Sequence, residues 1–465
     1  MQYRLRPLVA ILALAPATVF AAGFQLAETS VTGLGRAYAG EAAANDSIAV
    51  LSRNSAGIAG IDKSQFVVSG IYVIPQVDIE GTETAHYNGL YNQAASAANN
   101  ALGSQLAMLP TSYDGSTKDL ATSELLPTLY FATPIRDGLV FGFGTLAEFG
   151  LSTDYNGNTL EYGDKTELTA ITFKPSLAWQ LTPEVAVGAG LRFVYGEATL
   201  STATPAYFDD VNTAVTNYNA VAAAAGGALP TLLAVPGFQP ILHVTGDDWG
   251  YGYELGTVWT PSRDWRLAVS YRSSVDLTFE GSAKSVLSAV ANGPGSVDLT
   301  LPASLELAMR WQALPQLALY AGGQRTGWHS FDKLVVDMDS GVSFTAKEEN
   351  WRDVWRYAIG ADWQVAKSVI LRAGYANDQS PVPEANRTLS IPDVDRQWFS
   401  VGAGWQYSSA WTLDFGLAFL KGEKGNINEE FAINYNGNQV AVSSFNGSLS
   451  RADVVIAGLS ASYQF

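Results

Sequence analysis

Residues 265–280 read WRLAVSYRSSVDLTFE, and apolar and polar side chains alternate along the whole stretch. One set of alternate positions runs from Trp265 to Phe279 and is mostly apolar, whereas the other set carries Arg266, Arg272 and Glu280. Because successive side chains of a β-strand point to opposite faces, this period predicts a strand with one apolar and one polar face. The run exceeds the roughly 10 residues that a strand needs to cross the hydrocarbon layer of a membrane.

The same alternation recurs elsewhere in the chain, in residues 297–312 and in residues 455–465, which end on the aromatic Phe465. Soluble β-sandwiches are the alternative, but their strands are usually shorter. The sequence therefore favours an all-β, antiparallel transmembrane β-barrel. Its terminal aromatic residue resembles the signature by which the barrel-assembly machinery recognises outer-membrane barrels.

Connections between the strand-like stretches come in two sizes. Short turn signals, such as residues 135–138 and 261–264, alternate with long segments, such as 82–121, 202–245 and 422–447. Short turns on one side and long loops on the other are typical of outer-membrane barrels. We predict fourteen strands, at residues 63–80, 122–134, 138–152, 165–181, 185–200, 246–260, 265–280, 297–313, 316–331, 350–365, 368–379, 395–407, 411–421 and 449–465.

The stretch from Gly23 to Gly60 has no strand alternation of its own. It is rich in Gly, Ala and Ser, with scattered apolar residues such as Phe24, Leu34 and Ile58. We predict that residues 22–62 are a plug inside the lumen of a barrel formed by residues 63–465.

The first 21 residues are predicted to be a secretion signal, because Arg4 and Arg6 precede a short apolar core that Pro16 interrupts. Cleavage after Ala21 fits the pattern. The chain has 44 acidic and 27 basic residues and no cysteine. This excess of acidic residues argues against a nucleic-acid partner. Because an exported chain without cysteine cannot form disulfides, a closed hydrogen-bonded barrel would have to stabilise it.

Two loops contain helical rather than strand patterns, in residues 206–233 and 283–291. Such helices either cover the barrel mouth or form an apolar outer groove that captures a greasy solute. Residues of the groove would be Leu232, Leu233, Val286, Leu287 and Val290.

Several motifs resemble the FadL/TodX family of outer-membrane transporters for long-chain fatty acids and hydrocarbons. They are residues 22–26 (AGFQL), 33–41 (GLGRAYAGE), 149–155 (FGLSTDY), 372–383 (RAGYANDQSPVP) and 391–396 (IPDVDR). These motifs span most of the chain.

The resemblance implies a 14-stranded barrel with a plug in the bacterial outer membrane. It implies passive transport without a cofactor: outer loops capture an apolar molecule, an apolar lumen pocket binds it, and movement of the plug around Phe24 releases it. Release would pass through a gap in the wall at the third strand and into the membrane. The expected partners are a hydrophobic small molecule, membrane lipid and lipopolysaccharide, and we expect a monomer.

Two positions depart from the family pattern. The family's plug commonly carries Asn-Pro-Ala where this chain has Asn54, Ser55 and Ala56, and serine lacks the fixed φ of proline. We therefore expect a less rigid turn. Glu197 stands where fatty-acid members often carry a basic pocket residue, whereas Lys347 matches a second basic position. With one acidic and one basic residue at these two positions, both fatty acids and neutral hydrocarbons stay possible as substrates.

Glycines within the predicted third strand are Gly142, Gly144 and Gly150. Glycine inside a strand often marks a bulge or a close approach of another backbone. They indicate either the kink that opens the wall or ordinary packing against the plug.

Other functions have weaker support. His86, His243 and His329 are far apart in sequence and suggest no metal site, and no Gly-x-Ser-x-Gly elbow indicates a lipid hydrolase. A general porin would need an open pore, which a plug contradicts. We therefore predict a transporter rather than an enzyme.

Overall fold

A computed structural model describes residues 23–155, 165–205, 207–234, 237, 239–285, 292–435 and 438–465. Their strands form one closed antiparallel barrel with 14 strands crossing its wall. β1 (Gln65–Ala85) closes the wall because it pairs with β20 (Asn438–Gln464) on one side and with β3 (Glu124–Arg136) on the other. A closed wall leaves no strand edge unpaired in lipid.

The rest of the wall follows chain order, and several crossings consist of two segments. Its strands are β4 (Leu139–Asp154), β5 (Lys165–Gln180), β6 (Val185–Ala203), β7 (Pro240–Ser262), β8 (Trp265–Arg272) with β9 (Val275–Lys284), β10 (Gly293–Leu301) with β11 (Ser304–Leu314), β12 (Leu317–Thr326) with β13 (Lys333–Met338), β14 (Ser343–Glu348) with β15 (Val354–Ala366), β16 (Val369–Asp378), β17 (Arg396–Gln406), and β18 (Trp411–Gly422) with β19 (Gly425–Tyr435). The short β2 (Ser112–Asp114) pairs with β1.

The predicted strands at 265–280 and 297–313 are each interrupted at one level of the wall. In β8 the apolar residues face outward, and Val269 is 47% exposed. In β9 they face inward, and Val275 and Leu277 are buried. β11 and β10 switch in the same way around Pro302, because Leu307 is exposed whereas Leu299 and Leu301 are buried. The apolar face therefore meets lipid in one half of the barrel and lines the lumen in the other.

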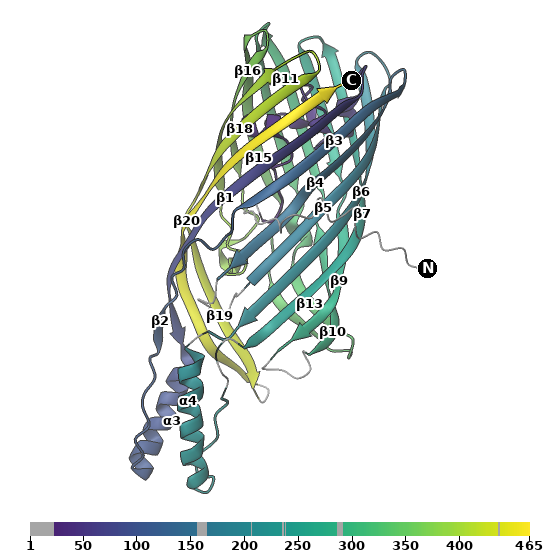
Figure 1. Cartoon of the computed structure of the whole chain (residues 1–465). Helices are drawn as coiled ribbons and strands as arrows, with labels where there is room; N and C mark the ends of the chain where they lie inside the picture. The colour runs from purple at the N-terminus through teal and green to yellow at the C-terminus, as the bar shows by residue number, and fades with distance from the viewer. Residues whose placement is uncertain are drawn as a thin grey trace.

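The two ends of the barrel differ as predicted. In Figure 1 the short turns and the C-terminus lie at one end, and α3 (His86–Leu102) and α4 (Phe208–Ala224) project from the other. We assign the helix-bearing end to the cell exterior, because outer-membrane barrels carry their long loops there. No helix in the described ranges is both long and apolar enough to span a membrane.

The N-terminal segment lies inside the barrel near the end with the short turns (Figure 1). Its elements are short: α2 (Val31–Gly35), η1 (Glu41–Ala43), η2 (Ile48–Ser52) and η3 (Ser55–Ile58). Ser30 caps α2 by accepting a hydrogen bond from Gly33 N at 3.0 Å, since a serine oxygen satisfies a free amide of the first turn. Almost every residue of the segment is buried, as expected for a plug.

Candidate functional site

Phe24 lies at the centre of an aromatic cage formed by loops at the outer half of the barrel. It is 1% exposed. Its ring centroid lies 4.6 Å from that of Trp328, 5.3 Å from that of Phe331 and 5.6 Å from that of Trp351. Full burial of one such side chain is worth about 1.5–3 kcal/mol, and edge-to-face pairs add to this. The cage therefore holds the start of the plug in place.

An apolar cavity of about 70 Å³ adjoins this cage. Phe24 and Phe331 form part of its wall, together with apolar residues from β4, β5, β10, β13 and the loop after β16. They are Leu151, Leu168, Leu299, Leu334 and Ile391. The volume admits only a few water molecules. A larger apolar ligand fits only if a side chain such as Phe24 moves.

β3 and β4 separate partway along the wall. They pair only from Leu129 opposite Thr145 to Arg136 opposite Leu139, although β4 continues to Asp154. Beyond Thr145, the plug takes the place of β3. Gln25 bridges Phe149, with Leu26 N donating to Glu148 O at 2.8 Å and Gly150 N donating to Phe24 O at 2.9 Å. Residues 24–26 therefore cover a break in the ladder of the wall.

Two of the three glycines of β4 do not lie at this break. Gly142 and Gly144 lie in the part of β4 that is still paired with β3. A methyl group at Gly142 would lie 2.7 Å from Ile58 Cδ1, so this glycine makes room for the plug. The irregularity is instead a bulge at Glu148, where the register with β5 shifts. Only Gly150 lies beyond the break.

Gly23 connects the cage to the loop between β16 and β17. Its amide donates to Asp393 Oδ2 at 2.9 Å. Asp393 also accepts a hydrogen bond from Ser380 Oγ at 2.7 Å and forms a buried ion pair with Arg396. Gly23 is thus held by a carboxylate that also bonds to Ser380 and Arg396.

The turn at residues 54–56 is tied to the barrel wall through Ser55. Its amide donates to Glu254 Oε2 at 3.1 Å, and its hydroxyl makes a short hydrogen bond to the same carboxylate. Lys174 Nζ lies 2.8 Å from Glu254 Oε2, and both side chains are buried. Proline has no amide hydrogen to donate. Ser55 therefore makes bonds to the barrel wall that proline could not make.

The neighbours of Ser55 fix the same turn. Asn54 Oδ1 accepts from Ala56 N at 2.9 Å, and Asn54 Nδ2 donates to Ala42 O at 3.0 Å. Gly188 of β6 lies directly beneath, since a methyl group there would be 2.2 Å from Ala56 N. The plug and the wall are in backbone contact here, and only glycine leaves the space.

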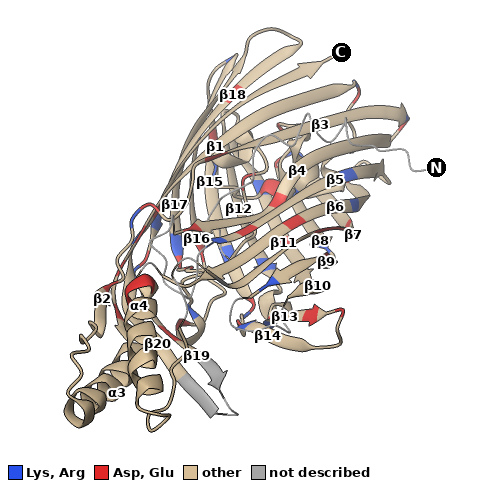
Figure 2. Cartoon of the chain, turned by 60° about the horizontal axis from the view of Figure 1, so that its bottom comes forward, with Lys and Arg blue, Asp and Glu red and all other residues tan. Residues whose placement is uncertain are grey.

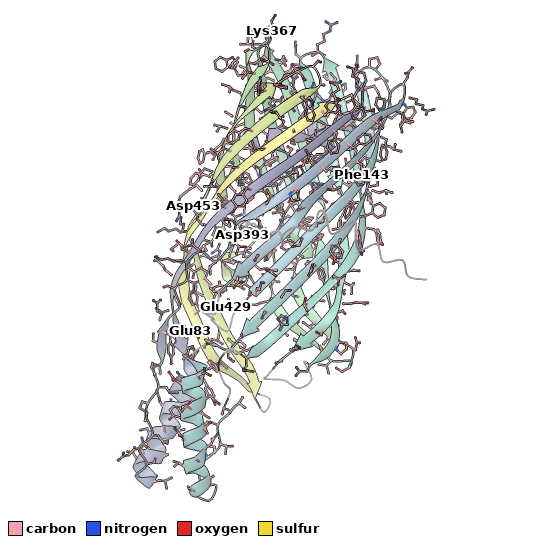
Figure 3. All side chains as sticks on the ribbon, viewed as in Figure 1. Glu83, Phe143, Lys367, Asp393, Glu429 and Asp453 are labelled. Carbon is pink, nitrogen blue, oxygen red and sulfur yellow. The ribbon has the colours of Figure 1, made fainter. Side chains whose placement is uncertain are left out.

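Lys347 lies at the outer half of the barrel, in β14. Its Nζ forms an ion pair with Glu429 Oε1 at 2.6 Å, with 14% of the lysine side chain exposed. Glu429 Oε2 accepts from Leu389 N at 2.8 Å. Figure 3 shows Glu429 and Asp393 between the middle of the barrel and the helix-bearing end, with Lys367 at the opposite end. A cation is therefore present near the apolar lumen, and a carboxylate already pairs with it.

Glu349 lies between this ion pair and the cage. It is 1% exposed and accepts from Trp351 Nε1 at 2.9 Å, and its Oε1 has no hydrogen-bond partner. Burial raises the pKa of this carboxyl to about 7, although the nearby Lys347 lowers it. The proton of Glu349 is thus coupled to a tryptophan that contacts Phe24.

Glu197 is not a pocket residue. β6 is regular in this region, and its inward set contains Arg192 and Val194, which are both buried. Glu197 belongs to the opposite, outward set and is exposed. The lumen assignment therefore fails by strand parity, because alternate residues point to opposite faces.

The outer helices pack on each other. Tyr91 of α3 and Tyr218 of α4 lie in one buried cluster, and Leu232 packs against it. Leu233 is 48% exposed, and its carbonyl accepts from Tyr87 Oη at 2.6 Å. The helices project beyond the barrel mouth (Figure 1). Val286, Leu287 and Val290 lie outside the described residues.

Several site residues escaped the sequence interpretation. Trp328, Phe331 and Trp351 are dispersed aromatic residues near strand ends, and only the folded chain brings them to Phe24. α3 lies within the long segment 82–121 that the sequence predicts between strands, and its spacing of Tyr91, Ala95 and Ala98 fits one helical face. In the described residues no group of three or more His, Cys, Asp or Glu could hold a metal ion.

Comparison with known proteins gives consistent matches over nearly the whole chain. The model of the family described as "Outer membrane protein transport protein (OMPP1/FadL/TodX)" matches residues 12–465. A long-chain fatty acid transport protein of Escherichia coli O6:H1 is 31% identical over 440 residues, covering 91% of this chain and 92% of the relative. Outer membrane protein P1 of Haemophilus influenzae is 31% identical over 420 residues, covering 88% of each.

Solved structures share the fold. A Pseudomonas aeruginosa FadL homologue superposes with a TM-score of 0.77 at 22% identity, over 96% of this chain and all of the other. The toluene transporter TbuX of Ralstonia pickettii superposes with a TM-score of 0.56 at 18% identity, over 94% of this chain and all of the other.

Proposed function

The chain belongs to the OMPP1/FadL/TodX family of outer-membrane transporters of hydrophobic compounds, and we propose that it takes up long-chain fatty acids without an energy source. It is located in the bacterial outer membrane. Family members transport solutes and do not act as enzymes. Our proposal concerns the substrate of this transporter and the route that the substrate takes through the barrel.

The route begins outside the cell, at the exposed apolar residues around α3 and α4, such as Leu90 and Leu233. The solute then enters the apolar lumen next to Phe24. This step is favourable because apolar surface leaves water, and the face switch of β9 and β10 supplies the apolar lining. Binding enlarges the cavity by displacing Phe24 from the cage.

Release follows at the wall. The observation that carries the proposal is the pairing of residues 24–26 with β4 where β3 has left it. A ligand that displaces Phe24 also breaks the two backbone hydrogen bonds to Glu148 and Gly150. The break between β3 and β4 then opens toward the membrane, and the solute leaves sideways without crossing the half of the lumen that the plug fills.

Fatty acids fit the chemistry of the outer lumen because Lys347 offers a cation for their carboxylate. The name of the E. coli relative at 31% identity supports this choice. Neutral hydrocarbons are the second candidate, because Glu429 already pairs with Lys347 and a neutral solute needs no cation.

Uptake by cells tests the proposal. A strain lacking the protein should lose growth on long-chain fatty acids and recover it with the wild-type gene but not with Lys347→Met. Mass spectrometry of ligand retained after mild detergent purification should identify fatty acid. Restored growth on aromatic hydrocarbons alone would favour the second candidate, and an open-pore conductance in planar bilayers would contradict a plugged transporter.

A further inference from the structure

A charge cluster lies directly behind the break between β3 and β4. Glu148 is the bulge residue of β4. Its backbone oxygen accepts a hydrogen bond from Leu26 N of the plug. Its side chain lies on the inner face of the barrel and is 3% exposed. Any solute that leaves through the break passes this side chain once residues 24–26 have moved.

Two arginines share the Glu148 carboxylate, but they are held differently. Arg192 of β6 is saturated: Nε and Nη2 donate to Glu148 Oε2 at 3.0 and 2.8 Å, and Nη1 donates to Ser273 O at 2.7 Å. Thr172 donates to the same oxygen at 2.7 Å. Oε2 is therefore fully occupied.

Arg272 of β8 is the weakly held partner. Its Nε donates to Ser304 Oγ at 2.9 Å, its Nη1 reaches Glu148 Oε1 only at 3.3 Å, and its Nη2 has no hydrogen-bond partner. The residue is 5% exposed. A buried guanidinium nitrogen without an acceptor is costly, so an additional anionic oxygen would be bound favourably at this place.

The surrounding charges favour an anion as well. Lys174 is neutralised by Glu254, and Arg53 lies 3.7 Å from Glu306. Arg53 and Glu306 both act electrostatically on Arg272. Among these residues four cations face the three carboxylates Glu148, Glu254 and Glu306, which leaves one cation in excess. Figure 2 shows basic and acidic positions interspersed along the strands of the barrel.

We propose that Arg272, supported by Arg192 and Glu148, forms a second carboxylate site at the lateral opening. The planar fork of a guanidinium binds a carboxylate through two parallel hydrogen bonds. A fatty acid is ionised at neutral pH, because a carboxyl group titrates at about 4–5. The site would receive the headgroup as it leaves Lys347 and make release selective for ionised acids over neutral solutes of the same length. This proposal rests on the lateral release proposed above.

The test compares uptake of a radiolabelled long-chain fatty acid with that of the fatty alcohol of equal length, using the full chain in proteoliposomes. Arg272→Gln should lower fatty-acid uptake by about tenfold, since it removes a charged hydrogen-bond donor, and should leave alcohol uptake within about twofold. Arg272→Lys should recover part of the loss for the acid. The matched control is Arg310→Gln, which removes a lumen arginine whose side chain donates to Gln312 and Tyr320 instead.

Folding of each variant is checked by the heat-dependent mobility of the barrel on gels, and Arg272→Lys keeps the charge if Arg272→Gln does not fold. Equal losses for acid and alcohol, or an unchanged acid uptake in folded Arg272→Gln, would overturn the second site. Wild-type protein that transports neither solute would instead overturn the proposed function.

Discussion

Ser55 shows how one residue decides whether the plug is loosely or firmly seated. Its amide and hydroxyl both reach the Glu254 carboxylate, which Lys174 also holds. Charge-assisted hydrogen bonds of this kind are stronger than neutral ones, and in a buried site an unpaired partner is costly. A family motif alone suggested a weaker turn, because sequence does not show which carboxylate faces it across the barrel.

Ser55→Ala should therefore destabilise the seated plug. The loss of a hydrogen bond to a buried carboxylate costs about 1.5–3 kcal/mol, and we expect more frequent openings in single-channel recordings and a lower midpoint of thermal unfolding. Ser47→Ala is the matched control, because Ser47 only caps η2 by accepting from Ala49 N at 3.2 Å. Equal effects of the two variants would contradict the role of Ser55.

Glu349 makes the cage sensitive to pH. Burial raises its pKa from the ordinary 4.5 to about 7, so the folded state binds this proton more tightly than the unfolded chain does. The contribution of the protonated group to stability is then complete below about pH 4.5 and falls as pH rises through about 7. Glu349→Gln should reduce the difference in thermal midpoint between pH 5 and about pH 8.5.

Glu348→Gln serves as the control for this experiment, because Glu348 is the adjacent residue, at the end of β14, and its side chain is exposed. The pH difference should persist in that variant. If Glu349→Gln and wild type showed the same pH dependence, the buried proton would not belong to Glu349.

Strands were the part of the fold that the sequence revealed best. Fourteen crossings and the plug followed from alternation and its absence, and the crossing number agrees with the structure. The interruptions around Ser273 and Pro302 did not follow. An unbroken apolar–polar alternation looks the same whether the apolar face meets lipid throughout or turns inward halfway. Only the burial of Leu277 and Leu301 distinguishes the two.

The site was harder to predict for a related reason. The family resemblance placed Glu197 in the pocket, but in the regular part of β6 alternate residues face opposite sides and Glu197 lies on the outward one. The bulge at Glu148 and the aromatic partners of Phe24 depend on contacts between segments far apart in sequence, for which a single sequence offers no period.

Gly188→Ala tests the contact between wall and plug at the level of the element. The new methyl group would lie 2.2 Å from Ala56 N, and backbone cannot yield as a flexible side chain can. We expect a barrel that still folds but conducts ions, because the plug no longer seats. Gly70→Ala is the control, since its methyl group would meet only Leu125 Cδ1, at 3.2 Å. A closed channel in folded Gly188→Ala would refute the tight contact.

The body of the plug and the segment before it are held in the barrel by different kinds of contact. This difference allows the segment to move while the body stays in place. The body of the plug is fixed by buried ion pairs, such as Arg36 with Asp362 at 2.8 Å, and by Ser55. The segment before it is held by apolar packing of Phe24, by backbone hydrogen bonds to Glu148, Gly150 and Asp393, and by two hydrogen bonds that the Gln25 side chain accepts from β12. An apolar ligand competes with apolar packing but not with ion pairs. It can therefore release residues 23–26 while the rest of the plug stays seated.

Lateral release gated by the plug is tested by locking residues 24–26 to β4. Gln25 and Phe149 form an antiparallel bridge in which the hydrogen bonds flank the pair, so their Cα atoms are about 4.5 Å apart and suit a disulfide. The chain has no cysteine of its own, so Gln25→Cys with Phe149→Cys introduces a single pair. If the plug gates lateral release, oxidation should abolish fatty-acid uptake and a reductant should restore it, while each single variant should transport in both conditions. Uptake that continues at the same rate in the oxidised double variant would contradict lateral release gated by the plug.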